Sequence, residues 1–134
     1  MKRVHVAAAV IRDDSGKILI ARRADTQHQG GLWEFPGGKV EADESVESAL
    51  ARELQEELGI VVGAARPLIK VRHDYPDKQV LLDVWEVSQF TGEPHGAEGQ
   101  PLAWVTAKDL LNYEFPAANQ PIVAAARLPG EYLI

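Results

Sequence analysis

The chain has 134 residues, a formal net charge of −6 and no cysteine. This length allows one domain with a buried core, so we expect residues 1–134 to form a single domain. The negative charge argues against binding of duplex nucleic acid, which requires a basic surface. The lack of cysteine excludes disulfides and thiolate metal sites, and no apolar segment is long enough to cross a membrane. These features are compatible with the cytoplasmic location that we expect.

The N-terminal part of the chain has the pattern of β-strands. Residues 4–12 are mostly apolar, with β-branched residues at alternate points, and residues 17–22 return to the same character. The segment 13–16, Asp-Asp-Ser-Gly, has the composition of a turn, so the two strands are expected to form a hairpin. Of the two arginines that follow, one is expected to contact a phosphate or a base. Solvated surface positions are the alternative for Arg22 and Arg23.

Two aromatic residues come next. Gly30 and Gly31 open a loop, and residues 32–36 read Leu-Trp-Glu-Phe-Pro. We expect only one of Trp33 and Phe35 to face the core. The other would then offer a flat surface on which a base can stack. Two core aromatics are the alternative.

Residues 46–58 are predicted to form an amphipathic helix. Ser45 is a suitable N-cap, the run contains no Gly or Pro, and Gly59 stands where a glycine ends many helices. Apolar residues recur every four positions along one side, at Val46, Leu50, Leu54 and Leu58. This side is expected to face the core.

A second stripe of the same helix carries Glu53, Glu56 and Glu57. Their spacing of i, i+3 and i+4 brings three carboxylates within one turn. Such a group repels itself unless a cation lies among its members, and carboxylate oxygens suit a hard divalent ion such as Mg²⁺ or Mn²⁺. A solvated acidic face is the alternative. Upstream, Gly37 and Gly38 allow tight turning and leave backbone carbonyls accessible.

The rest of the chain predicts further strands and two helices. The expected elements, in order, are a strand at 61–62 and 68–73, a turn at 75–78, a partner strand at 79–87, a polar loop at 91–99, a short strand at 101–105, and helices at 107–111 and 122–128. The two long strands are expected to form a second hairpin. Strands, an inserted helix, more strands and a terminal helix favour an α/β fold with a mixed sheet and helices on both faces.

The spacing of fixed residues from Gly38 onward resembles the signature of the Nudix hydrolases. Gly38 is followed after five residues by Glu44, and after seven more by Arg-Glu-Leu-Gln-Glu-Glu-Leu-Gly-Ile at residues 52–60. Every position of the pattern G, x5, E, x7, R-E-U-x-E-E-x-G-U is matched, where U is bulky and apolar. Such a match is far more specific than a lone glycine motif. The resemblance implies a Nudix-type α/β/α sandwich and Mg²⁺-dependent hydrolysis of nucleoside diphosphates linked to another moiety.

The same resemblance assigns roles to particular residues. The implied metal ligands are carboxylates and a backbone carbonyl, from Glu53, Glu56, Glu57, Glu98 and Gly37 or Gly38. They are expected to hold Mg²⁺, with Mn²⁺ as an alternative. Glu53 or Glu98 would act as the general base. Arg52 would orient the carboxylates, and Glu44 would support it.

Three segments outside this signature resemble the MutT-type 8-oxo-dGTP diphosphatases within the family. They are residues 32–38 with Arg23 upstream, residues 92–101, and residues 115–121. The nucleotide pocket that this implies contains Arg23, Phe35, Asp77, Lys78 and Asn119. Lys78 departs from the arginine expected there, and a lysine does not offer the same planar fork. Asn119 has an alternative role as the N-cap of the following helix.

The expected reaction is hydrolysis of a nucleoside triphosphate to a monophosphate and pyrophosphate, by a monomer or weak dimer. Residues 31–35 also resemble Nudix enzymes that act on CTP or modified dCTP, which is the second hypothesis. A non-catalytic Nudix-like domain is the third, but such a domain is expected to have lost carboxylates of the signature, and none is missing here.

Overall fold

The computed structural model of the protein describes residues 2–24 and 30–128. Its larger sheet has four strands in the order β4-β1-β6-β5, with β1 and β6 parallel and the other pairs antiparallel. These strands are β1 (Lys2–Ile11), β4 (Gly37–Lys39), β5 (Val61–Tyr75) and β6 (Lys78–Thr91). A smaller sheet has the order β3-β2-β7, formed by β3 (Trp33–Glu34), β2 (Ile18–Arg22) and β7 (Leu102–Val105).

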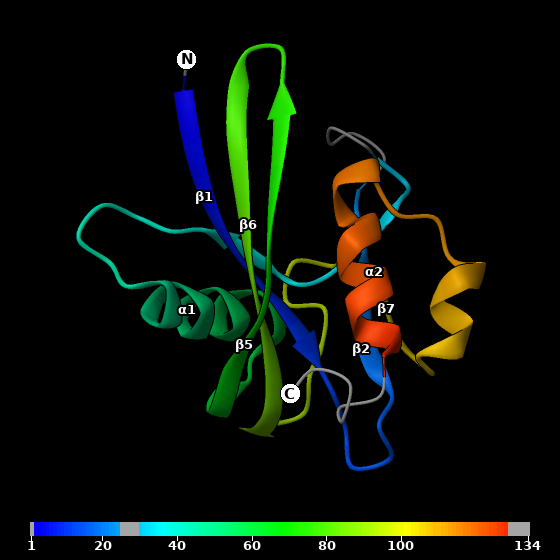
Figure 1. Cartoon of the computed structure of the whole chain (residues 1–134). Helices are drawn as coiled ribbons and strands as arrows, with labels where there is room; N and C mark the ends of the chain where they lie inside the picture. The colour runs from blue at the N-terminus through cyan, green and yellow to red at the C-terminus, as the bar shows by residue number, and fades with distance from the viewer. Residues whose placement is uncertain (1, 25–29, 129–134) are drawn as a thin grey trace.

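The two helices lie on opposite faces of the larger sheet (Figure 1). Helix α1 (Val46–Leu58) packs on one face, and α2 (Gln120–Arg127) packs on the other beside the smaller sheet. Alternate residues of β1 enter two separate cores: Ala7 and Ala9 face α1, whereas Ala8 and Val10 face α2. Burial on both faces explains why this strand is apolar throughout. The predicted arrangement, a mixed sheet between helices, is confirmed.

The expected hairpin between the first two strands is wrong. A turn forms between them, in which the Asp13 side chain accepts hydrogen bonds from the backbone N–H groups of Ser15 and Lys17. The chain then enters the smaller sheet. A single isolated bridge, between Arg12 and Ile18, forms where the expected hairpin would have paired the two strands. Both edges of β1 are occupied, by β4 and by the parallel strand β6. Apolar strands joined by a turn do not reveal such distant partners.

Helix α1 has the predicted bounds because its two ends are capped. The Ser45 side chain accepts a hydrogen bond from the Ser48 backbone N–H at 3.1 Å. Gly59 ends the helix in the left-handed region at φ 71°, and its N–H donates to the Gln55 carbonyl. The buried side consists of Ala49, Leu50, Leu54 and Leu58.

The second hairpin is confirmed and is longer than predicted. Strand β5 runs without a break from Val61 to Tyr75 and pairs with β6 over its length, with register shifts near Ala64 and Pro67. Pro67 has no backbone N–H to donate. Because β5 is an edge strand, with β6 as its one neighbour in the sheet, a proline is tolerated at this position. The hairpin and the start of β1 extend beyond α1 (Figure 1). One face of this extension is therefore left without a covering helix.

The remaining segments differ from expectation in detail. The helix expected at 107–111 is a 3-10 helix, η1 (Lys108–Asn112), and another, η2 (Ala117–Asn119), precedes α2. Trp33 and Phe35 both pack on the α2-side core, so the expectation that only one faces inward is wrong. Residues two apart in extended backbone share a face. Among the described residues, no helix is long and apolar enough to cross a membrane.

Replacement of Ser45 by alanine is expected to lower the free energy of unfolding by about 1 kcal/mol, because the Ser48 N–H loses its acceptor. Chemical denaturation would measure this loss. Ser88→Ala, a change of the same type at an exposed strand position, is the matched control. An equal loss in both variants would contradict a capping role.

Candidate active site

The site is built where the backbone of β4 passes between β1 and α1. Gly37 has φ 153°, and a Cβ there would overlap the Ala7 carbonyl oxygen. A Cβ at Gly38 would overlap the carboxylate of Glu53. Gly37 therefore requires glycine, and a side chain at Gly38 would displace the Glu53 carboxylate. The absent side chains let the carboxylate stripe of α1 lie directly against the strand backbone.

Arg52 organises one part of this stripe. Its Nε and Nη2 donate to the two carboxylate oxygens of Glu44 at 2.8 and 3.0 Å, and Nη1 donates to Glu53 at 2.9 Å. Nη2 also donates to the Lys39 carbonyl oxygen at 3.1 Å, which ties the helix to the end of β4. The bidentate contact with Arg52 lowers the pKa of Glu44 to about 2. Glu44 therefore stays ionised and fixes the guanidinium that orients Glu53.

Glu57 is partly buried and lies close enough to three other carboxylates to feel their charge. Its Oε2 accepts a hydrogen bond from the Gly37 N–H at 3.2 Å. Burial, followed by the negative charges of Glu53, Glu34 and Glu98, raises the pKa of Glu57 to about 8. A crowded group of this kind disfavours its own ionisation, so bound positive charge would stabilise it.

The loop after β6 brings Glu98 to this group by capping the end of α1. The N–H groups of His95 and Ala97 donate to the carbonyls of Leu58 and Glu57. The Gln100 side chain also donates to the Glu57 carbonyl at 3.0 Å, and its oxygen accepts from the Glu98 N–H. The free carbonyls of the last helical turn thus hold the loop, and the loop holds Glu98 beside Glu57.

Glu34 is a site residue that the sequence analysis missed. It accepts a hydrogen bond from Arg23 Nη1 at 2.6 Å, across the paired strands β2 and β3. Burial raises the pKa of Glu34, Arg23 opposes that shift, and Glu98 adds to it. The available signal in the sequence is a carboxylate between two aromatic residues, at 33–35.

Two cavities share the Arg23–Glu34 pair as a common wall. One of about 200 Å³ is lined by this pair with Glu57, Glu98 and residues 99–101. The other, about 310 Å³, is lined by the pair with Phe35, the Gly37–Gly38 backbone, Tyr75, Lys78 and Asn119. An acidic compartment therefore adjoins a more apolar one.

Four of the five expected substrate residues meet in the larger cavity, and Asp77 does not. Asp77 is exposed in the turn between β5 and β6 and does not line that cavity. Lys78 lies with its Nζ 5.5 Å from the centre of the Tyr75 ring. Phe35 is 4% exposed and stacks on Phe115, with ring centres 5.2 Å apart. Only the part of Phe35 that faces the cavity is therefore available to a ligand.

Asn119 has the position of a helix cap without making the capping bond. It precedes α2, but its backbone is already helical and its side chain makes no capping hydrogen bond. The amide is partly buried and lines the larger cavity. This observation favours the ligand-facing alternative for Asn119 over the capping one.

The carboxylates fit a hard divalent ion by their chemistry. All the candidate ligands are oxygen atoms, and the raised pKa of Glu57 reflects burial among like charges. Within residues 2–24 and 30–128, no three of these side chains are already gathered as a metal-binding group. Glu53 instead contacts Arg52, and the largely exposed Glu56 lies 3.5 Å from the same guanidinium.

Comparison with known proteins identifies the family. The model of the NUDIX domain family matches residues 7–125. The chain therefore belongs to the NUDIX domain family, and the sequence-based identification of a Nudix hydrolase is confirmed.

Similar proteins include two from Escherichia coli strain K12. The chain is 41% identical over 124 residues to an 8-oxo-dGTP diphosphatase, covering 92% of this chain and 96% of that protein. It is also 41% identical over 125 residues to a CTP pyrophosphohydrolase, covering 93% and 92%. A solved MutT structure, from a study of the Aliivibrio salmonicida and Vibrio cholerae proteins, has 44% identity and a TM-score of 0.84. That match covers 94% of this chain and 98% of the other.

Replacement of Glu57 by glutamine is expected to stabilise the metal-free protein more at about pH 9 than at about pH 5. The folded-state pKa of Glu57, about 8, exceeds its ordinary value of 4.5. The contribution of the protonated Glu57 side chain to the free energy of unfolding is therefore fully present below pH 4.5, and it is lost as the pH rises through 8. Thermal unfolding in EDTA would measure the difference between variant and wild type. A difference that does not change with pH would contradict the raised pKa.

Proposed function

We propose that the protein is a metal-dependent nucleoside triphosphate pyrophosphohydrolase that converts 8-oxo-dGTP to 8-oxo-dGMP and pyrophosphate. The observation that carries this proposal is the pair of adjoining cavities: three carboxylates line one, and an aromatic and an amide side chain line the other. A triphosphate with its metal ions suits the first, and a modified purine suits the second. Removal of oxidised nucleotides from the precursor pool, in the cytoplasm, would be its role.

The similar proteins support a nucleotide substrate and leave two bases in competition. The E. coli 8-oxo-dGTP diphosphatase and CTP pyrophosphohydrolase have the same identity to this chain. Hydrolysis of CTP or a modified dCTP is therefore the second candidate. The partly buried amide of Asn119 in the larger cavity favours the oxidised purine, because oxidation at C8 turns the N7 acceptor of guanine into a donor.

The metal ligands are proposed from the carboxylate group of α1 and its loop. Glu53, Glu56, Glu57 and Glu98, with a carbonyl of Gly37 or Gly38, would hold Mg²⁺, and Mn²⁺ has compatible chemistry. When bound, the metal supplies positive charge to the triphosphate and lowers the pKa of water.

The chain's own residues then position and deprotonate the attacking water. Glu53 is held by Arg52, whose guanidinium is itself fixed by Glu44. Glu53 is therefore a pre-oriented candidate for the general base, and Glu98, on its loop beside Glu57, is the other. Arg23, held by Glu34, is at the boundary of the two cavities, where it can donate to the phosphate end of a nucleotide.

A panel of substrates tests the proposal directly. Values of kcat/KM with Mg²⁺ would be compared for 8-oxo-dGTP, dGTP, 8-oxo-GTP, CTP, dCTP and 5-methyl-dCTP. A preference for 8-oxo-dGTP over dGTP and over every pyrimidine is expected. A preference for CTP or 5-methyl-dCTP would establish the second candidate instead, and release of orthophosphate would exclude pyrophosphohydrolase chemistry.

Replacement of Glu53 by glutamine is expected to lower kcat by about 10²- to 10⁴-fold without unfolding the protein, because a positioned carboxylate is lost. Steady-state kinetics at saturating Mg²⁺ would measure the loss. Glu47→Gln, at an exposed position in the first turn of the same helix, is the matched control and should retain activity. Near-normal kcat in the Glu53 variant would exclude its proposed role.

Replacement of Asn119 by alanine is expected to lower kcat/KM for 8-oxo-dGTP by roughly 10- to 100-fold, because a buried polar group of the ligand loses its partner. The loss on dGTP should be smaller, so the ratio of the two values falls. The melting temperature should change little, since Asn119 makes no capping bond. A constant ratio with a lower melting temperature would assign Asn119 a structural role.

A further inference from the structure

The face of the larger sheet that extends beyond α1 carries a row of basic side chains. The register pairs Arg3 with Gln79, and His5 with Leu81, between β1 and β6. Leu81 is also paired with Arg72 on β5. Side chains of paired residues share a face and neighbouring strands are about 4.8 Å apart. Arg72 and His5 therefore flank Leu81, and Arg3 lies one step further along the same face.

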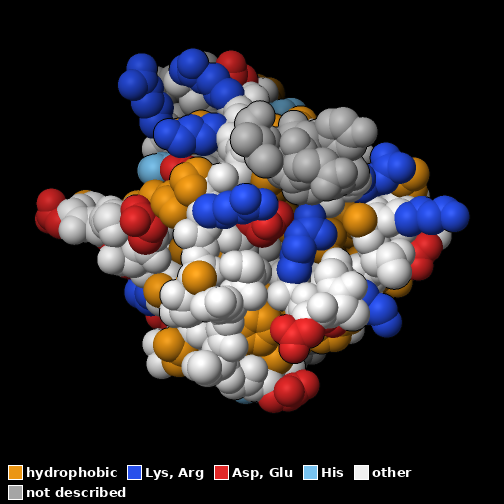
Figure 2. Space-filling view, turned by 60° about the horizontal axis from the view of Figure 1, so that its bottom comes forward, with side chains coloured by type: hydrophobic (Ala, Val, Ile, Leu, Met, Phe, Trp, Pro, Cys, Tyr) orange, Lys and Arg blue, Asp and Glu red, His pale blue; other side chains and the backbone are white. Residues whose placement is uncertain are grey.

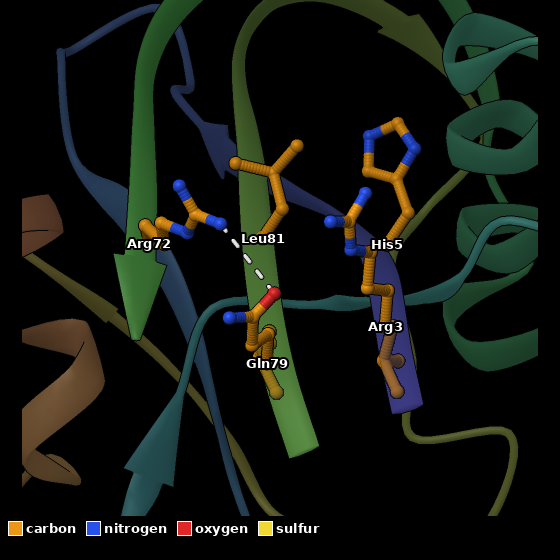
Figure 3. A pocket seen from close by; sticks show the side chains of 7 residues that line it. Arg3, His5, Arg72, Gln79 and Leu81 are labelled. Carbon is orange, nitrogen blue, oxygen red and sulfur yellow. Dashed lines mark hydrogen bonds between the residues drawn. The ribbon is translucent and has the colours of Figure 1, made fainter. Parts of the chain in front are cut away.

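These residues enclose a pocket outside the candidate active site (Figure 3). Its volume is about 360 Å³, within the range of small-molecule sites. Figure 3 shows the Arg72 and Arg3 side chains on opposite sides of Leu81 and Gln79. In the space-filling view, Lys and Arg side chains gather on the side of the molecule where β1 begins (Figure 2). Leu81 and Gln79 thus form the floor of the pocket, and the two arginines lie on either side of it.

The two guanidinium groups are not neutralised by carboxylates. Arg72 donates one long hydrogen bond, 3.4 Å, to the neutral side chain of Gln79. The exposed Arg3 side chain has no hydrogen bond or ion pair with any described residue. Of the carboxylates on this face, Asp83 accepts hydrogen bonds from His5 and Trp85. Asp74, which the register pairs with Gln79, makes no ion pair with either arginine among the described residues. Two unpaired positive charges therefore face one pocket in a chain whose net charge is −6.

We propose that this pocket is a second anion site, which binds a diphosphate group between Arg3 and Arg72. Each guanidinium presents a planar fork of donors that matches phosphate oxygens, and their separation across three strands suits two linked phosphates better than one. The Gln79 amide supplies a further donor at the floor. The ligand is inorganic pyrophosphate or the diphosphate of a nucleotide, which share this chemistry.

The second site is separate from the candidate active site but shares a wall with it. Val4 and Val80 border both this pocket and the larger cavity of the candidate active site, from opposite faces of the same sheet. The two sites also differ in charge. Glu34, Glu57 and Glu98 line the smaller active-site cavity together with Arg22 and Arg23, whereas no carboxylate of the described residues lines the second pocket. Without a divalent ion those carboxylates repel polyphosphates, whereas the arginines of the second site need no metal.

Calorimetric titration of the full chain with pyrophosphate in EDTA tests the proposal. We expect one binding event in the wild type, and about tenfold or greater weakening in R3Q/R72Q, because charge-assisted hydrogen bonds are lost. K17Q/K108Q removes two positive charges at exposed positions away from the pocket and is the matched control, with unchanged affinity expected. Circular dichroism would verify that both double variants are folded.

Amide chemical shifts would locate the site during the same titration. Changes centred on residues 3–5 and 79–81 support the proposal, and changes centred on residues 53–57 overturn it. Absence of binding in the wild type, or equal weakening in both double variants, also overturns it. A parallel titration with dGDP separates the two ligand sources: equal affinity means that phosphate alone is bound, and tighter binding means that the nucleoside contacts the pocket floor.

Discussion

The contact between the Gly37–Gly38 backbone and the carboxylates of α1 is the constraint on which the site depends. A side chain at either glycine would overlap the Ala7 carbonyl or the Glu53 carboxylate. The contact closes β4 onto the edge of β1 and presents a donor, the Gly37 N–H, to Glu57. The same closeness concentrates negative charge, which burial makes more costly. The close contact between β4 and α1 therefore fixes the position of the helix and also creates the excess of negative charge that a cation would neutralise.

Both ends of α1 contribute to the site through ordinary capping chemistry. At the start, Glu44 precedes the Ser45 cap and accepts two hydrogen bonds from Arg52. At the end, unpaired carbonyls accept hydrogen bonds from the loop that carries Glu98. These carbonyls would otherwise need water or another partner. The Gln100 side chain thus joins the loop to a residue of α1 that lies 43 positions earlier in the chain.

Local chemistry allowed prediction of the helix and much of the site, but not of contacts between distant strands. Ser45 and Gly59 signal helix ends wherever they occur, and the spacing of Glu53, Glu56 and Glu57 follows from helical geometry. The pairing of β1 with β6 depends on competition among several apolar strands, which local sequence does not encode. Glu34 was missed because its place in the site depends on its hydrogen bond with Arg23, which the pairing of β2 with β3 brings close to it. Asp77 was expected in the pocket by resemblance, yet it is exposed at a turn.

The two adjoining cavities of the candidate active site are lined by different parts of the chain. Carboxylates come from α1 and the loop that caps it, whereas Tyr75, Lys78 and Asn119 come from the β5–β6 turn and η2. Under the proposed function, substitutions in the turn and η2 can alter the bound base while the carboxylates proposed for hydrolysis and their supports stay unchanged. Because the two sets of residues are separate, few mutations would be needed to change which substrate is bound. This separation is consistent with 41% identity both to an 8-oxo-dGTP diphosphatase and to a CTP pyrophosphohydrolase, and it makes the β5–β6 turn and η2 the segments where divergence in specificity should concentrate.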